Sequence, residues 1–155
     1  MNITLIAFGK GMPDWVATGF TEYQKRLPKD FSLTLKELKA EERGNASVEA
    51  WLAKEAIKLR EATPKGAFTV ALDERGADLS TTAFAAHIEV WRAHSNEIVF
   101  YVGSADGLDA ALKAQSHARM RLSSLTLPHM LVRVMLAEQI YRAWSVLNHH
   151  PYHRV

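Results

Sequence analysis

The last residues of the chain carry side chains that can move protons, bind anions and stack on flat rings. Asn148–Arg154 reads NHHPYHR, so three imidazoles, a phenol and a guanidinium lie close together. A neutral imidazole accepts a proton near physiological pH, a guanidinium binds phosphates and oxyanions, and Tyr and His rings stack on bases. We therefore expect this tail to take part in an active site, with an ordinary disordered terminus as the alternative.

A metal site is a second interpretation of the tail. His149, His150 and His153 could ligate zinc, but a closed site takes four ligands and the chain has no cysteine to complete it. The lack of cysteine also excludes disulfides and cysteine nucleophiles. We therefore predict that the protein holds no metal.

A predicted helix over Pro128–Val146 leads into the tail and is apolar on nearly every side. Such a helix must be buried on two sides, so we expect one side to pack on a sheet and the other on a partner subunit. Glu138 and Arg142 are four residues apart and can pair on one face, either to orient the tail or substrate or as a purely structural pair. The apolar residues are Leu131, Val132, Val134, Met135, Leu136, Ile140, Tyr141, Ala143 and Trp144.

Three predicted loops follow strands, at the edge where open parallel sheets bind ligands. They are Asp73–Gly76, Gly103–Gly107 and Ser123–Leu127. The glycines allow the backbone to approach a ligand closely, and the third loop offers hydroxyls and amides between apolar residues, which suits an adenine ring. The alternative is that all three are ordinary turns. A fourth glycine-rich segment, Gly9–Asp14, lacks the third glycine of a dinucleotide fingerprint, and Asp14 is better explained by the helix dipole.

The elements that must position these loops alternate along the chain, which predicts an α/β fold with a parallel sheet in one domain, residues 1–155. The predicted strands are Asn2–Phe8, Phe31–Leu38, Ala67–Leu72, Glu97–Val102 and Met120–Leu125. The predicted helices are Pro13–Leu27, Ala46–Ala62, Thr81–Arg92 with a cap from Ser80, Leu108–Ser116 and Pro128–Val146.

Composition restricts the class of protein further. No apolar stretch is long enough for a membrane span, and the first residues do not form a signal peptide, so we expect a cytoplasmic enzyme. The net charge of +2 permits an acidic partner such as RNA without requiring one.

Several stretches of the sequence resemble the RlmH family, a group of small SPOUT-superfamily methyltransferases. The resemblance implies a SPOUT-type parallel sheet flanked by helices, a C-terminal trefoil knot, a homodimer and S-adenosylmethionine as methyl donor. It implies methylation of N3 of a pseudouridine in the 23S ribosomal RNA of the assembled ribosome. The matching stretches cover essentially the whole chain: MPDWVATGFTEYQKRLPKD near the start, LTLPH, LVRV, AEQIYRAW and the ending NHHPYHRV.

The resemblance also implies which residues form the site. By match to the family pattern, the cofactor contacts fall on Leu72, Gly103, Leu122, Ser123, Ser124, Leu125, Thr126 and Leu127. Residue type and position then suggest roles for the tail in this reaction. His153 would help the N3 proton leave, Arg154 and Arg142 would hold phosphate or the imidate oxygens, and Tyr152 would stack on the base. Glu138, paired with Arg142, would orient the tail or the substrate at an interface.

One loop departs from the family pattern. Gly103–Gly107 reads GSADG where the family often has GGPEG, so Ser104 and Ala105 replace a glycine and a proline. The change motivates one rival function, a ribosome-binding protein that keeps the fold without turnover. A second rival is a nicotinamide-dependent oxidoreductase that uses the Gly9–Gly11 segment.

Overall fold

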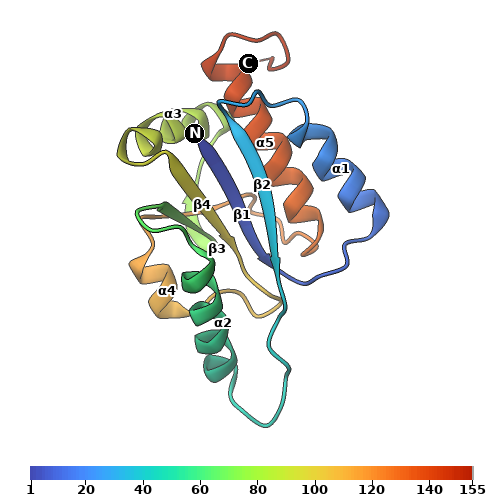
Figure 1. Cartoon of the computed structure of the whole chain (residues 1–155), viewed down its shortest axis with the longest axis vertical. Coiled ribbons are helices and arrows are strands. Elements are labelled where there is room, and N and C mark those ends of the chain that lie inside the picture. Colours follow the sequence, from blue (N-terminus) through green and yellow to red (C-terminus); the bar gives the residue numbers. More distant parts are fainter. Residues whose placement is uncertain (155) are drawn as a thin grey trace.

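The computed structural model describes residues 1–154 as a five-stranded sheet with helices on both faces (Figure 1). All strands are parallel, in the order β2-β1-β4-β3-β5. This confirms the predicted α/β parallel sheet. The strands are β1 (Asn2–Phe8), β2 (Ser32–Leu38), β3 (Phe68–Asp78), β4 (Glu97–Val102) and β5 (Ala118–Arg121). The helices are α1 (Asp14–Gln24), α2 (Val48–Ala62), α3 (Thr81–His94), α4 (Ala110–Gln115) and α5 (Leu131–Leu147).

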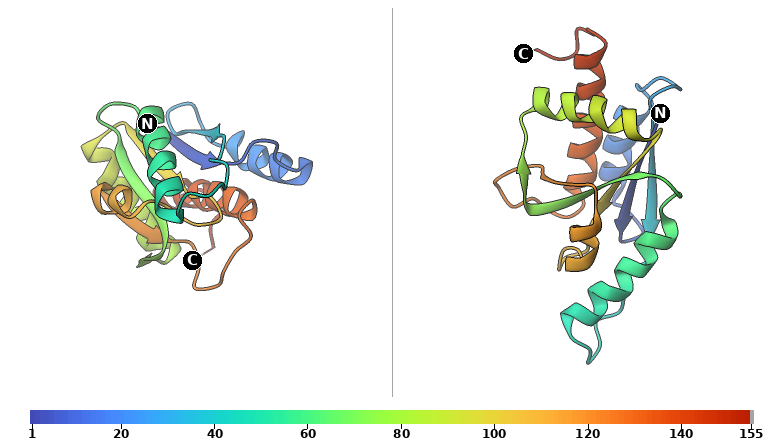
Figure 2. Two further views of the ribbon diagram at one scale, coloured as in Figure 1. Left: turned by 90° about the horizontal axis from the view of Figure 1, so that it is seen from below. Right: turned by 90° about the vertical axis from the view of Figure 1, so that its left-hand side faces the viewer.

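Helices lie on both sides of the sheet (Figure 2), and an apolar core fills each of the two interfaces. On one face, α1, α3 and α5 contribute side chains such as Phe20, Ile88 and Leu136. On the other face, α2 and α4 contribute Leu59 and Leu112. The middle strands therefore have apolar side chains pointing both ways, which is why they read as continuous hydrophobic runs.

Helix α5 is covered by its own chain on more sides than the sequence pattern suggested. It packs on the sheet between α1 and α3. Gly19 of α1 lies so close to it that an added Cβ would sit 3.1 Å from a methyl of Val134. Leu131, Val132 and Met135 remain partly exposed. The apolar circumference is thus explained in large part by neighbouring helices, and this strip near the start of the helix is left partly open to a partner.

Most element boundaries shift by a few residues from the predictions, and two strands differ in more detail. The strand predicted over Met120–Leu125 exists as β5 but lies earlier in the chain, at Ala118–Arg121; its last four predicted residues are wrong, because the pairing with β3 ends where Asp78 meets Arg121. The predicted loop Asp73–Gly76 lies inside β3. Both Leu72 and Ala77 are in register with Met120, so these four residues form an excursion from the strand. Ser80 caps α3 as predicted, accepting a hydrogen bond from the Ala83 amide at 3.2 Å.

Candidate functional site

A cavity of about 610 Å³ lies at the carboxyl edge of the sheet. Its walls come from the β3 excursion, the loop after β4, and the segment between β5 and α5, with His129 and Val132 beside them. The three predicted loops therefore do converge on one cavity. All eight residues predicted to contact the cofactor line it: Leu72, Gly103, Leu122, Ser123, Ser124, Leu125, Thr126 and Leu127.

The loop after β4 is a tight reversal that needs its two glycines. The Gly107 amide donates to the Ser104 carbonyl at 2.9 Å, and Gly107 has a φ of 85°. A Cβ added at Gly103 would lie 2.5 Å from the carbonyl oxygen of Gly107. The first glycine is thus required by the close approach of the backbone to itself, and the second by its left-handed conformation.

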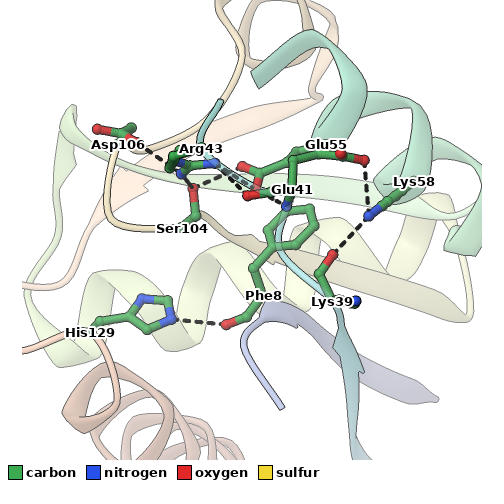
Figure 3. A network of polar contacts seen from close by, with 9 residues as sticks. All are labelled: Phe8, Lys39, Glu41, Arg43, Glu55, Lys58, Ser104, Asp106 and His129. Atoms are coloured by element: carbon green, nitrogen blue, oxygen red, sulfur yellow. Dashed lines mark hydrogen bonds and ion pairs between the residues drawn. The ribbon is translucent and has the colours of Figure 1, made fainter. Parts of the chain in front are cut away.

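Ser104 is one of the two residues at which this chain departs from the family pattern. Its hydroxyl is hydrogen-bonded to a buried carboxylate (Figure 3). It donates to Oε1 of Glu55 at 2.8 Å and accepts from Arg43 at 3.1 Å. Glu55 is a buried residue of α2, and its other oxygen accepts from the Glu41 amide at 3.1 Å. Ser104 therefore adds a link between the cavity wall and α2.

Arg43 extends this link to the segment between β2 and α2. Its guanidinium pairs with Asp106 at 2.8 Å, reaches Glu55 at 3.5 Å and lies over the Trp51 ring at 5.0 Å. Neither Arg43 nor Glu55 is singled out in the sequence analysis. The available signal was a carboxylate at position 55, between the apolar positions 52 and 59 on one face of the predicted helix.

Arg133 is a fully buried cation that ties the start of α5 to the ends of β1 and β2. It pairs with Glu37 at 2.7 Å and donates to the carbonyls of Phe8 and Gly9 at 2.9 and 2.8 Å. His129 donates through Nε2 to the same Phe8 carbonyl at 2.9 Å. Gly9 has a positive φ of 101°, so the Gly9–Gly11 turn presents carbonyls to Arg133. These glycines do not line the cavity.

The predicted catalytic residues form a second cluster where the tail folds back on the last turns of α5. Tyr152 donates to Glu138 at 2.9 Å, and Arg142 donates through Nε to the same carboxylate at 2.8 Å while covering the Tyr152 ring at 4.9 Å. Burial, followed by the Glu138 carboxylate, raises the pKa of Tyr152 well above its usual value. The phenol is therefore a neutral donor across the range in which most enzymes work.

His153 and Arg154 complete this tail cluster. His153 Nδ1 lies 2.8 Å from the hydroxyl of Ser145, a buried residue of α5. Arg154 is exposed. The tail turns at His149, whose φ of 53° ends the helix: the His150 amide donates to the Ser145 carbonyl and the His149 amide to the Val146 carbonyl. This is a Schellman motif, with histidine where glycine is usual.

Within one chain the tail cluster and the cavity lie at opposite ends of α5, whose course is shown in Figure 1. The cavity touches α5 near its first turn, at Val132, whereas Arg142 lies ten residues later, roughly 15 Å along the helix. The structure thus brings the eight predicted cofactor residues together around one cavity. It brings Glu138, Arg142 and Tyr152 into contact, with His153 bonded to Ser145 and Arg154 exposed next to it in the tail, but it does not bring the two sets together.

Two further findings concern residues 1–154 only. No group of three or more potential metal ligands comes together among them, so His149, His150 and His153 do not form a three-histidine site there. None of the helices described is long and apolar enough to cross a membrane.

Comparison with known proteins gives matches along the full length of the chain. A family model described as "Predicted SPOUT methyltransferase" matches residues 1–153. A protein of Ralstonia pickettii is 49% identical over 156 residues, covering 100% of both chains. Proteins of Bordetella pertussis and Bordetella petrii are 50% and 52% identical over 155 residues, covering 99% of each chain. All three are named ribosomal RNA large subunit methyltransferase H.

Proposed function

The chain belongs to the SPOUT methyltransferase family, and from this premise we propose that it transfers a methyl group from S-adenosylmethionine to N3 of a pseudouridine in 23S ribosomal RNA of the assembled ribosome. The observation that carries the proposal is the single cavity at the sheet edge, lined by all eight residues expected to bind the cofactor. The full-length likeness to enzymes named for large-subunit ribosomal RNA supports the choice of substrate.

The cavity fits S-adenosylmethionine in size and chemistry. About 610 Å³ lies within the range of pockets that enclose small ligands. Leu72, Val102 and Leu122 offer apolar walls for an adenine ring, and the Ser123–Leu127 segment offers backbone groups for its edge. Gly103 and Gly107 also line the cavity, and the tight reversal that forms this wall has no room for a side chain at Gly103. When bound, the cofactor supplies an electrophilic methyl group on a sulfonium.

The residues of the tail would prepare the RNA base. His153 accepts the N3 proton, so that the nitrogen lone pair can attack. Arg154 is exposed and binds RNA phosphate or the developing imidate oxygen. Arg142 is already paired with Glu138, so we propose that this pair orients Tyr152, whose ring stacks on the base.

We propose that the enzyme is a homodimer in which the tail of one subunit completes the cavity of the other. The tail lies at the far end of α5 from the cavity of its own chain, so it cannot serve that cavity without unfolding from the helix. If two α5 helices run antiparallel about a two-fold axis, each tail comes beside the partner's cavity. The partly exposed Leu131, Val132 and Met135, next to the cavity, supply an apolar strip for this contact.

We further propose that residues 1–155 act as one cytoplasmic SPOUT domain whose C-terminal segment forms a trefoil knot. What supports the knot is the path of residues 122–130. They leave the edge strand β5, line the cavity beyond β3 and β4, and arrive at the end of β1, where His129 contacts Phe8. Strand connections that take such a route are rare in unknotted folds.

No observation favours either of the two rival functions. The ribosome-binding alternative depended on the Ser104 departure, but that hydroxyl is accommodated by Glu55 and leaves the cavity wall intact. The oxidoreductase alternative depended on Gly9–Gly11, which bind Arg133 through a carbonyl and lie outside the cavity lining.

Two measurements test the proposal together. Calorimetric titration should show binding of S-adenosylmethionine and none of NADH. Mass spectrometry of ribosomal RNA from a strain that lacks the gene should show loss of one N3-methylated pseudouridine, restored by the intact gene. Binding without restored methylation would favour the non-catalytic alternative, and binding of NADH alone would overturn the proposal.

A further inference from the structure

The hydroxyl of Ser145 is a buried polar group that makes three contacts, all with the tail. It lies in the last turn of α5 and is fully buried. Its oxygen is 2.9 Å from the His150 carbonyl, 3.1 Å from the His153 amide nitrogen and 2.8 Å from His153 Nδ1. The Schellman turn at His149 brings these groups over the serine, because it reverses the chain directly after the helix.

The hydrogen-bonding capacity of a serine decides which atom carries the imidazole proton. A hydroxyl has one proton to donate and two lone pairs to accept with. A carbonyl can only accept, so the serine proton goes to His150, and a backbone amide can only donate, so His153 N–H takes one lone pair. The remaining lone pair faces Nδ1, and this contact is a hydrogen bond only if Nδ1 carries the proton.

We infer that Ser145 is a positioning residue that fixes His153 in its Nδ1–H form, so that Nε2 keeps a lone pair. The opposite form would require the serine proton to turn to Nδ1, which would leave the His150 carbonyl without this donor. Among residues 1–154 no hydrogen-bond partner is found for Nε2, so the basic nitrogen is available to a substrate.

The consequence for catalysis rests on the proposed function. Nε2 takes the proton from N3 of the pseudouridine while N3 forms its bond to the methyl carbon, and the electron pair of the broken carbon–sulfur bond stays on sulfur. The imidazolium that results keeps its Nδ1–H bond to Ser145. With the proton on Nε2 instead, His153 would offer the base a donor and could not accept its proton.

The tautomer is measured directly by NMR of protein labelled with ¹⁵N-histidine, without RNA or cofactor. Long-range ¹H–¹⁵N spectra at about pH 8.5, where an ordinary imidazole is neutral, distinguish a protonated Nδ1 from a protonated Nε2. The His153→Gln variant identifies the signal. We expect Nδ1–H in the wild type, and a neutral His153 that carries its proton on Nε2 would overturn the inference.

Ser145→Ala should remove this preference and slow single-turnover methylation about tenfold, with the affinity for S-adenosylmethionine unchanged. Asn148→Ala is the matched control, because that side chain donates to the Trp144 carbonyl in the same region and makes no contact with His153. A wild-type tautomer in Ser145→Ala would refute the role of the serine. If Ser145→Ala does not fold, Ser145→Cys provides the same test with a weaker hydrogen-bonding group.

The same measurements separate this inference from the proposed function. Suppose that the wild type carries the proton on Nδ1, that Ser145→Ala loses this preference, and that Ser145→Ala still methylates at the wild-type rate. The positioning role of Ser145 then stands, but His153 is not the base. If the wild type has Nδ1–H but never methylates ribosomes, the proposed function fails and the tautomer assignment stands.

Discussion

At the scale of single residues, Tyr152 combines a buried phenol with a carboxylate partner. Its pKa is higher in the folded protein than in the unfolded chain, so as pH rises the phenol ionises in the unfolded chain at a lower pH than in the folded one. The folded state therefore loses stability as pH rises above about 10. We predict that the free energy of unfolding falls with pH in this range and that Tyr152→Phe reduces the slope. Denaturant titrations at several alkaline pH values measure both. Identical slopes in the two proteins would show that Tyr152 ionises as easily as it does in an unfolded chain.

Glu55 and Ser104 should act as a pair on the cofactor cavity. Glu55→Gln weakens the bonds that hold the Ser104 loop to α2, and Ser104→Ala removes one of them. We predict that each variant weakens S-adenosylmethionine binding by about tenfold and that the double variant is little worse than either, because contacting residues are not additive. Calorimetry measures the four affinities.

Glu41→Gln is the control for this pair, because the Glu41 side chain pairs with Lys58 at 3.0 Å on the outer side of the same network (Figure 3). It should bind the cofactor as the wild type does. Fully additive losses for Glu55 and Ser104 would mean that the two residues act separately.

The residues lining the cavity could be predicted from the sequence, whereas those that hold them could not. Leu72, Gly103 and the Leu122–Leu127 run lie at or just beyond the ends of predicted strands and match the family pattern. Glu55 and Arg133 were missed because a charge within an apolar helix pattern gives no information about its partner. Glu55 meets Ser104, 49 residues away, and Arg133 meets Glu37, 96 residues away.

At the scale of elements, the end of α5 carries local strain. His149 adopts a left-handed φ of 53°, which costs a residue with a side chain roughly 1 kcal/mol relative to glycine. We predict that His149→Gly stabilises the fold by about this amount, a rise in melting temperature of roughly 2–4 °C for a domain of this size. Asn148→Gly should not stabilise, because Asn148 has a negative φ and bonds to Trp144. Calorimetry measures the melting temperatures of both variants. A loss of stability in His149→Gly would contradict the assignment of strain.

The excursion in β3 depends on Gly76. An added Cβ would lie 2.6 Å from the backbone nitrogen of Met120 in β5, so Gly76→Ala must push the two strands apart. We predict a loss of more than about 2 kcal/mol of stability. Gly44→Ala, at a position with open space, is the matched control and should change little. An unfolding midpoint of Gly76→Ala equal to that of Gly44→Ala would refute the close approach.

The sequence predicted every element by type but not the details of β3 and β5. Periodicity and apolar runs identify strands, yet an excursion depends on the partner strand. Gly76, which follows three charged residues, indicates a simple turn when the position of β5 beside it is not known.

At the scale of the whole molecule, a shared site makes two inactive subunits complement each other. One variant, Gly103→Val, damages the cavity, and another, lacking residues 151–155, has no tail. We predict that each alone is inactive, and that the co-expressed pair recovers about a quarter of wild-type methylation. Random pairing makes half of the dimers mixed, each with one intact site. Light scattering should give twice 17.4 kDa for the wild type, and a dimer mass for each of the two variants as well. A mixture that stays inactive despite dimerising would place the tail and the cavity of one chain in the same site.

Helix α5 is fixed at both ends, by Arg133 against β1 and β2 and by the Ser145 turn against the tail. One residue inserted or deleted between them would rotate the tail by about 100° and move it by about 1.5 Å relative to the sheet. Evolution can therefore exchange side chains along this helix but cannot change its length by one residue. Indels should be confined to segments such as residues 39–47, where neither end of the helix is disturbed. In alignments of homologous chains, the number of residues from Arg133 to Ser145 should be constant.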